Sequence, residues 1–282
     1  MIDVARQTWR LLEPYHGMIY FAPEATAAYG ELGLRGRAGY FASRSAALGV
    51  VPAPVVVATF YNFNPVLVAE SLDGVWSVTD PAAVLAARYA AADQALRGTL
   101  GDAITSPELR RAATLLRAAA EAVAGDVAGR PLFAAHTALP WPTEPHLVLW
   151  HAQTLLREYR GDAHVAALST AGLSGIEALV THAASGAVPA ETLRTSRAWT
   201  EADWSAAVSG LRARGWLIED ADLTFTPDGA ARRAEIEKAT DERSVRPYAH
   251  IGESACVELQ ALVRPFSRAL TEKLMPWALS RQ

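Results

Sequence analysis

The chain has 282 residues, of which 51% are hydrophobic and 20% charged, with a net charge of −4; this balance is typical of a folded globular protein. An acidic total argues against a nucleic-acid binder, because such proteins gain most of their affinity from cations that neutralise phosphates. No apolar run reaches the length of a membrane span, and the single Cys256 cannot form an internal disulfide, so we expect a cytoplasmic protein.

The first half of the chain is predicted as a series of helices. A helix over residues 3–22 should kink or end near Glu13, because Pro14 removes a backbone donor. Short helices over 24–30 and 36–48 flank a Gly-Leu-Arg-Gly turn, a helix-turn-helix rhythm. A further helix begins with Asn64 as its N-cap, and long Ala-rich helices cover 80–100 and 107–124.

Residues 125–146 contain four prolines and little periodicity, which is typical of a connector. In the second half we predict helices over 147–159, 163–170, 174–185 and 200–214. Residues 216–225 should form a short β-hairpin. Long helices then run from Thr226 to about residue 241 and from 253 to 274.

The two halves resemble each other. Residues 31–53 and 170–190 both contain Gly-Leu-x-Gly, an apolar run, and then Ala-Ala-x-Gly-x-Val-Pro-Ala. Gly33 matches Gly172, an offset of 172 − 33 = 139, and Pro52 matches Pro189, an offset of 189 − 52 = 137. Because self-similarity at a fixed period indicates repetition, we predict a tandem duplication. Repeat 1 covers 1–128, a Pro-rich connector 129–146, and repeat 2 covers 147–282.

The second half resembles MarR-type winged-helix regulators. The resemblance lies in LRARGWL, where the recognition helix would end, and in LTFTPDGAARRAEIE, where the dimerisation helix would begin. The matching positions are Leu211, Gly215, Leu217, Leu223, Thr226 and Gly229. The resemblance covers residues 147–241 and reaches the first half through the repeat.

MarR proteins are homodimers of subunits about half as long. The resemblance therefore implies a mainly α fold with two tandem winged-helix-like domains, small β-wings and long dimerisation-type helices. The chain would be a monomer that acts as an internal pseudodimer and would regulate transcription in response to a ligand. It also resembles an actinobacterial helix-turn-helix family.

The surface that would face DNA departs from the MarR pattern. The recognition helix of repeat 2 begins with Glu201 and Asp203, and the wing carries Glu219, Asp220 and Asp222. Phosphates repel these carboxylates, so we expect weakened or lost DNA contacts. The residues left as a local DNA-binding patch are Arg194, Arg197, Arg212 and Arg214.

A first polar cluster lies near the N-terminus and contains Glu13, Tyr15, His16 and Tyr20. On an uninterrupted helix Glu13, His16 and Tyr20 would share one face. His16 is a candidate general base or a ligand of haem or a metal, with Tyr15 and Tyr20 as ligand-binding residues. The alternative is that these side chains pack at an interface between the halves.

A second polar cluster occupies LREYRGDAH. Its members are Arg157, Glu158, Arg160, Asp162 and His164. They are candidates for an anion site or for acid–base catalysis by His164 with Asp162 or Glu158. The alternative is a capping and salt-bridge network at a helix junction.

Other candidate ligand-binding residues are His151, on the same helix as this cluster, and Tyr61, Asn62 and Asn64. Amides flanked by aromatic rings suit a pocket for a planar organic molecule. The alternative is that Asn62 and Asn64 are helix caps.

The chain has no nucleotide-binding, nucleophile-elbow or zinc-protease motif, so we assign no metal site. Haem or another aromatic ligand is the cofactor class compatible with the clusters. Three functions follow as hypotheses. The favoured one is a MarR-like regulator that binds a small aromatic or polycyclic molecule. The alternatives are an enzyme of secondary metabolism with acid–base chemistry between the repeats, and a protein-interaction module.

Overall fold

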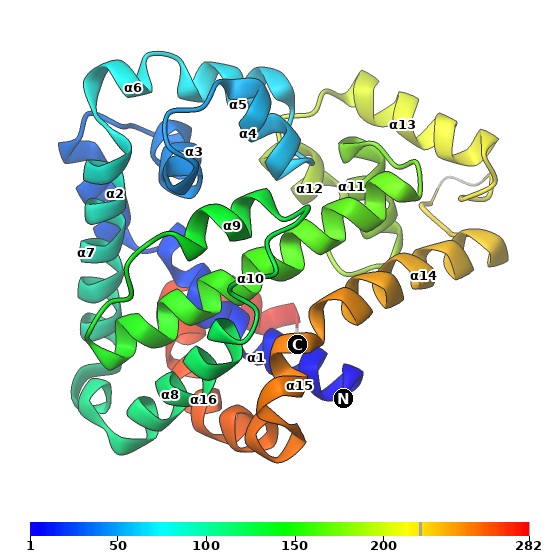
Figure 1. Ribbon diagram of the computed structural model, residues 1–282. Helices are drawn as coiled ribbons and strands as arrows, with labels where there is room; N and C mark the ends of the chain where they lie inside the picture. The colour runs from blue at the N-terminus through cyan, green and yellow to red at the C-terminus, as the bar shows by residue number, and fades with distance from the viewer. Residues whose placement is uncertain (220–221, 282) are drawn as a thin grey trace. The chain divides into compact units, whose positions relative to one another are not determined.

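The computed structural model describes residues 1–219 and 222–281, and these are almost entirely helical (Figure 1). The chain forms two compact units. The first unit comprises Met1–Val50, Gly74–Asp162 and Asp241–Gln282, and the second comprises Val51–Asp73 and Ala163–Thr240. Each unit therefore takes residues from before and after the Pro-rich connector.

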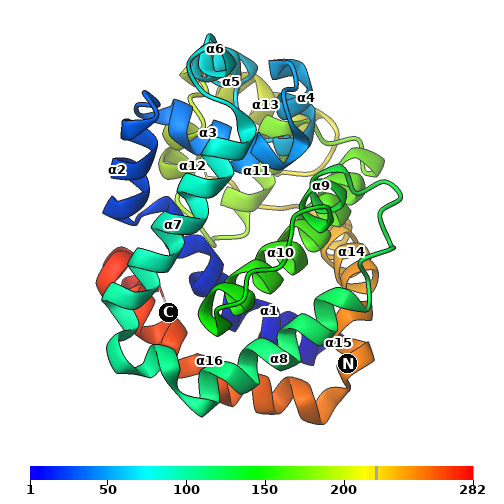
Figure 2. The ribbon, with the colours of Figure 1, turned by 60° about the vertical axis from the view of Figure 1, so that its left-hand side comes forward.

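The first unit is built around paired helices, seen from a second side in Figure 2. Helix α1 packs along α16, α2 along α7, and α8 against α15 and α16. The elements of this unit are α1 (Ile2–Gly17), η1 (Met18–Tyr20), α2 (Pro23–Glu31), α3 (Arg37–Ser45), η2 (Ala46–Leu48), α6 (Val75–Val78), α7 (Pro81–Leu100), η3 (Gly101–Thr105), α8 (Pro107–Glu121), α9 (Pro131–Thr137), α15 (Arg246–Ile251), α16 (Glu253–Leu274) and η4 (Pro276–Arg281).

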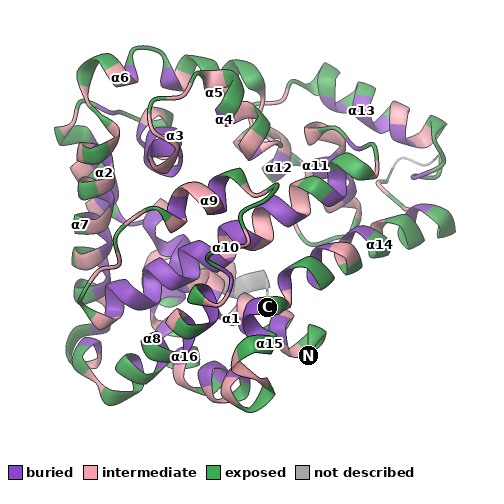
Figure 3. Cartoon of the chain, in the orientation of Figure 1, coloured by how far each residue is buried: buried purple, intermediate pink, exposed green. Residues whose placement is uncertain are grey.

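Two long helices contribute to both units. Helix α10 (Pro145–Thr170) begins in the first unit and α14 (Pro227–Ser244) begins in the second. Every residue from 146 to 156 is buried, and this stretch of α10 is uniformly purple in Figure 3. A helix buried on all sides belongs to the interior of its domain, so α10 is the central helix of the first unit.

The second unit holds the helix-turn-helix. Its elements are α4 (Ala53–Phe60), α5 (Pro65–Leu72), α11 (Gly175–Ala184), α12 (Ala190–Ser196) and α13 (Glu201–Ala213). Helix α11 packs on α12 and α13, and α4 packs on α5. The core includes Leu179, Trp204, Leu211 and Trp216. Asn64 is the N-cap of α5, as predicted, because its Oδ1 accepts a hydrogen bond from Val66 N at 2.9 Å.

Two predictions about local structure need correction. Helix α1 does not end near Glu13 but continues through Pro14 to Gly17, because the lost donor at Pro14 removes only one hydrogen bond while Tyr15 and His16 bury their side chains. The β-wing is also wrong, since no strand occurs among the described residues. One antiparallel bridge joins Leu217 to Phe225, too short a pairing for a ladder, and Asp220 lies outside the described residues.

Within the described residues, no single helix combines the length and apolar character needed to cross a bilayer. Two bent helix pairs, residues 37–48 with 53–60 and residues 145–170 with 175–184, meet that criterion by length and composition only.

Candidate functional site

The most unusual feature of the first unit is a buried chain of hydrogen bonds centred on His16. Its Nδ1 lies 2.9 Å from Thr154 Oγ1 and its Nε2 lies 2.8 Å from Tyr20 Oη. The Thr154 hydroxyl donates its only proton to the carbonyl of Trp150, at 2.9 Å, so it must accept from His16. Nδ1 therefore carries the proton and, in the neutral imidazole, Nε2 accepts from Tyr20.

The charge state of His16 follows from its surroundings. Burial lowers the pKa of His16 well below its usual value, and the guanidiniums of Arg157, Arg88 and Arg44 lower it further. His16 is therefore neutral at physiological pH, with its basic nitrogen directed at the Tyr20 hydroxyl. Both ring nitrogens are engaged, which leaves neither for a haem iron or a metal ion.

Three arginines surround the ring of Tyr20. The guanidinium carbons of Arg44, Arg88 and Arg157 lie 5.8, 5.6 and 5.9 Å from the ring centroid. They come from α3, α7 and α10, so three helices distant in sequence converge here. Contacts at this distance are cation–π interactions, which gain strength when water is excluded.

Two carboxylates compensate part of this positive charge. Glu158 Oε1 accepts from Arg157 Nη1 at 3.0 Å and from Arg44 Nη2 at 3.4 Å. Glu13 Oε1 accepts from Arg157 Nε at 2.9 Å. Burial alone would raise the pKa of Glu158, but Arg157 and Arg44 outweigh it and lower the pKa to about 2. Glu158 is thus ionised and shared between two arginines.

Arg88 interacts with Glu158 only at longer range. It is only 2% exposed, and its Nη1 donates to Ser43 Oγ at 3.4 Å. Its guanidinium also faces the rings of Tyr20 and Trp150, the latter at 5.2 Å. Among the described residues no carboxylate lies within ion-pair distance of it. A buried cation without an ion-pair partner is costly, and the hydrogen bonds of Arg88 with Ser43 and Tyr20 offset part of that cost.

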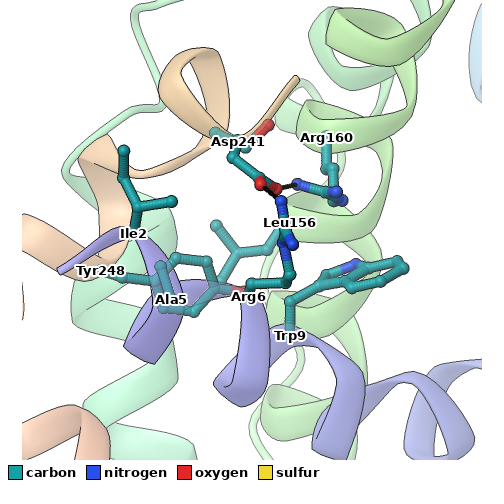
Figure 4. A pocket seen from close by; sticks show the side chains of 9 residues that line it. Ile2, Ala5, Arg6, Trp9, Leu156, Arg160, Asp241 and Tyr248 are labelled. Atoms are coloured by element: carbon teal, nitrogen blue, oxygen red, sulfur yellow. Dashed lines mark hydrogen bonds and ion pairs between the residues drawn. The ribbon is translucent and has the colours of Figure 1, made fainter. Parts of the chain in front are cut away.

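A second polar group in the first unit lines a small pocket (Figure 4). Arg160 Nη1 pairs with Asp241 Oδ1 at 2.7 Å, Arg6 pairs with the other oxygen, and Arg160 stacks over Trp9 at 4.7 Å. The Trp9 indole nitrogen and the Tyr248 hydroxyl are buried without a hydrogen-bond partner in the described chain. Arg160 thus belongs to an ion-pair group on α1, α10 and α14 and not to the His16 cluster.

Three further predicted residues are engaged elsewhere in the first unit. Tyr15 is fully buried and its hydroxyl donates to the carbonyl of His146 at 3.2 Å. The Nδ1 of His151 lies 2.5 Å from Tyr89 Oη, and burial, then His136 and Arg117, lower its pKa to about 3. Asp162 Oδ2 accepts from the backbone nitrogen of Phe133 at the start of α9, at 2.9 Å.

Four predicted site residues, the catalytic candidate His164 and three ligand-binding candidates, lie in the second unit. His164 Nδ1 is 2.9 Å from Thr240 Oγ1, a contact between α10 and α14. The other three are Tyr61, Asn62 and Asn64, between α4 and α5. Tyr61 donates to the carbonyl of Leu173 through a short hydrogen bond. The catalytic pairing of His164 with Asp162 stays a prediction.

Asn62 and Asn64 lie against the turn between α12 and α13. The Asn62 carbonyl accepts from the indole nitrogen of Trp199 at 3.0 Å. Asn64 donates through Nδ2 to the carbonyl of Ala198 at 3.0 Å and through its backbone nitrogen to the carbonyl of Arg197 at 3.1 Å. Segment 51–73 therefore covers the turn that leads into the helix expected to read DNA.

The four arginines of the predicted DNA patch have partners inside the second unit. Arg194 pairs with Glu191 at 2.8 Å and with Glu201 at 3.2 Å. Arg214 pairs with Glu177 through a short contact. Arg197 donates to Ser196 Oγ at 2.8 Å and lies over the ring of Phe63, and Arg212 donates to the carbonyl of Ile218 at 3.1 Å.

The first turns of α13 carry no exposed cationic side chain that could contact a phosphate. Glu201, Ala202, Ser205 and Ser209 are exposed there, while Asp203 closes a capping box with Thr200. Recognition helices read bases with residues near their N-terminus. This end of α13 offers carboxylates instead of the cations that phosphates attract.

The sequence prediction missed Arg44, Arg88 and Thr154. The position of Arg88 could have been recognised in the sequence, because it stands in the Ala-rich helix α7 four residues after the buried Val84 and three before the buried Ala91. An arginine on the apolar stripe of a helix is buried unless it reaches past its neighbours. Arg44 and Thr154 belong to no motif, and only the packing of α3 and α10 brings them to the cluster.

No group of three or more His, Cys, Asp or Glu side chains is placed to share a metal ion within residues 1–219 and 222–281. A helix-turn-helix family model matches residues 5–276, nearly the whole chain. No curated protein and no solved structure matches it. Helix-turn-helix domains are typical of DNA-binding regulators. On the extent of that match, the chain belongs to this helix-turn-helix family.

Proposed function

We propose that the chain is a small-molecule-binding, MarR-like regulator whose DNA contacts are weakened and whose ligand sits in the buried cluster of the first unit. The observation that carries the proposal is Arg88, a cation with 2% exposure and no carboxylate partner in the described chain. Such a group is stable when a bound molecule supplies what the protein lacks. Tyr20, His16 and Trp150 offer aromatic surface around it, which suits a small aromatic or polycyclic ligand.

The weakening of the DNA contact is supported by the second unit. Segment 51–73 is bonded to the turn at residues 197–199, and the arginines nearby are paired with Glu191, Glu201 and Glu177. For DNA to bind, these pairs would have to open beside the carboxylates of Glu201 and Asp203, at the start of α13. We therefore expect only the weak, salt-sensitive affinity of non-specific binding.

A tandem duplication is part of the proposal. Helices α3, α4, α5 and α7 occur in the same order as α11, α12, α13 and α14, with the short α6 inserted between α5 and α7. The matched glycines support this, because Gly33 and Gly172 have φ of 79° and 68°, and Gly49 and Gly186 have φ of 78° and 76°. Glycine is the residue that adopts such angles without steric cost.

The test combines a ligand measurement with a DNA measurement on the full chain. Native mass spectrometry of gently purified protein should reveal one bound small molecule that is lost on denaturation. Fluorescence anisotropy with the protein's own upstream DNA should give a dissociation constant above about 1 μM at physiological salt, without sequence preference. Nanomolar, sequence-specific binding would contradict the weakened DNA contact, and the absence of any bound or bindable molecule would contradict the ligand site.

An enzyme is the second candidate, and the hydrogen bonds of His16 favour it. A neutral His16 accepts from Tyr20 at 2.8 Å and donates to Thr154 at 2.9 Å, an arrangement that can take a proton from a substrate through the Tyr20 hydroxyl. Tyr20→Phe would remove that route while keeping the ring. Lost turnover with unchanged ligand affinity in this variant would identify an enzyme, whereas unchanged chemistry would leave a binding protein.

A further inference from the structure

The small pocket of Figure 4 is separate from the cluster around His16. Its walls come from α1, α10, α14 and α15, and every residue that lines it belongs to the first unit. The empty space, including the part that is open to solvent, is about 260 Å³. This volume is below the roughly 300–1,000 Å³ of pockets for drug-sized ligands, so an occupant would be smaller than such a ligand.

Two hydrogen-bonding groups in the wall of this pocket are buried without a partner in the described chain. They are the indole nitrogen of Trp9 and the hydroxyl of Tyr248, and Tyr248 is only 3% exposed. Burial, and then the nearby Cys256, raise the pKa of Tyr248, so its hydroxyl keeps its proton at physiological pH and can donate it. The indole N–H can only donate. A buried donor without an acceptor is costly, so an acceptor bound in the pocket would stabilise the fold.

The charges around the pocket favour an acceptor that is an anion. Among the described residues that line it, Arg6 and Arg160 are cationic and Asp241 alone is acidic. Both oxygens of Asp241 are engaged, Oδ1 with Arg160 at 2.7 Å and Oδ2 with Arg6. A further carboxylate that acts on the pocket wall, that of Glu13, is paired with Arg157. Two cations beside one anion stabilise a bound negative charge more than a neutral group.

The remaining contacts suit a short aliphatic chain. Apolar side chains such as Ile2 and Leu156 line the pocket together with the rings of Trp9 and Tyr248 (Figure 4). Arg6 is the polar residue that reaches solvent, since its side chain is 32% exposed. Its Nε is buried and has no hydrogen-bond partner among the described residues. The pocket thus combines donors and positive charge with a small apolar surface.

We propose that this pocket binds the carboxylate group of a small aliphatic acid about the size of acetate. The carboxylate oxygens accept hydrogen bonds from the indole nitrogen of Trp9 and the hydroxyl of Tyr248, and Arg6 donates a charge-assisted hydrogen bond through Nε. The short carbon chain packs against the apolar side chains of the wall. This site is additional to the ligand site proposed at the His16 cluster, and each can exist without the other.

The experiment follows the indole N–H signals of the full chain by two-dimensional NMR, on nitrogen-labelled protein titrated with sodium acetate. The signal that disappears in Trp9→Phe is that of Trp9. Acetate should move this signal downfield until the site is saturated, because the indole N–H gains a charged acceptor. The indoles of Trp150 and Trp199 already donate to the carbonyls of His16 and Asn62, so their signals should stay in place.

Two further titrations and three variants define the site. Acetamide, the neutral isostere, and sodium chloride at matched ionic strength should both move the Trp9 signal far less than acetate does. Tyr248→Phe keeps the ring and should weaken acetate binding by about tenfold or more. Arg6→Gln should lower the affinity for acetate to that for acetamide. The matched control is Tyr159→Phe, which should bind acetate like wild type because the Tyr159 hydroxyl donates to Asp126 Oδ2 at 2.5 Å, outside the pocket.

The proposal is overturned if the Trp9 signal stays in place throughout the acetate titration, which would mean that water alone occupies the pocket. It is also overturned if acetamide or chloride moves the signal as far as acetate does, or if Tyr248→Phe binds acetate as tightly as wild type. Should Tyr248→Phe not fold, the comparison of acetate with acetamide in the wild-type protein still decides. A co-purified molecule that persists in Trp9→Phe would sustain the function proposed above whichever result is obtained here.

Discussion

The two units place their arginines in opposite ways. In the second unit Arg194 pairs with Glu191 and Glu201, whose side chains are 69% and 76% exposed. In the first unit Arg88 is 2% exposed and has no carboxylate partner in the described chain. Exposed pairs contribute between 0 and about 1 kcal/mol, whereas a buried charge costs several kcal/mol without compensation. The location of a charge, more than the number of charges, thus guides the proposal of which region would bind a ligand.

If the DNA contact is weakened as proposed, the fold of this helix-turn-helix chain need not suffer. The ion pairs of the second unit are at the surface and are weak, so their loss or gain during divergence changes stability little. The charges of the first unit are coupled to one another and to the core. A change in one of them should therefore alter the free energy of unfolding of the whole unit.

The largest effect should come from Glu158→Gln. This change leaves Arg44 and Arg157 without their shared carboxylate, and breaking a buried ion pair costs about 3–5 kcal/mol. Urea unfolding followed by circular dichroism at pH 7 measures the loss. Glu258→Gln, which removes the exposed partner of Arg111, is the control and should cost less than about 1 kcal/mol. Equal losses in the two variants would erase the contrast between buried and exposed charge.

The same residue predicts a pH dependence. The pKa of Glu158 in the folded protein is about 2, below its ordinary value of 4.5. Its contribution to the free energy of unfolding is therefore complete above pH 4.5 and is lost as the pH falls through 2. Wild-type protein should therefore lose stability over that acid range. Glu158→Gln should lack this part of the acid loss.

The next effect concerns the contact between segment 51–73 and α11. A Cβ on Gly175 would lie 1.9 Å from the carbonyl oxygen of Tyr61, so Gly175→Ala must displace backbone and should cost about 3 kcal/mol. Gly210→Ala is the matched control inside α13, where the nearest atom is 3.7 Å away, and should gain about 0.5–1 kcal/mol. If Gly175→Ala unfolded in urea like wild type, the segment would not rest on the helix-turn-helix.

A smaller effect of opposite sign should come from Asp162→Asn. Burial raises the pKa of Asp162 from 3.8 to about 6, and nearby Glu158 adds to this. The folded protein favours the protonated form of Asp162. The resulting contribution to the free energy of unfolding is complete below pH 3.8 and is lost as the pH rises through 6. The variant should not show this decline and should be more stable than wild type by about 1–2 kcal/mol at pH 7. Parallel pH profiles for the two proteins would contradict the shift.

The smallest effect should come from Arg194→Ala. Because its partners are exposed, its removal should change the free energy of unfolding by less than about 1 kcal/mol. DNA affinity in the anisotropy assay should stay within twofold of wild type. A tenfold loss of DNA affinity would show that Arg194 reaches phosphate and would sharpen the role of the second unit.

The sequence predicted most helices correctly because their signals are local. Proline at the first turn, Asn64 as a cap and glycines in turns depend only on neighbouring residues. The prediction of a β-wing was wrong because a strand needs a partner segment of sufficient length. Leu217 and Phe225 form a single bridge.

The candidate site was predicted in two separate pieces. His16 and Tyr20 were assigned to one cluster and Arg157 and Glu158 to another, and the fold brings all four together. The spacing could not show that Arg88 joins them. Tertiary packing decides which helix the apolar face of α7 contacts. The sequence shows only that Arg88 is a polar residue on the apolar face of its helix.

The second unit is discontinuous, since it joins Val51–Asp73 to Ala163–Thr240. During synthesis, residue 73 is made 163 − 73 = 90 residues before the second segment of this unit begins, an interval of roughly 5–20 s at ordinary translation rates. Throughout this interval the valine-rich helix α4, whose Val56 and Phe60 are buried in the finished protein, has only α5 of its own unit to pack against. Exposed apolar surface favours aggregation, so we expect the nascent segment to depend on a chaperone or on temporary contacts until the second unit closes.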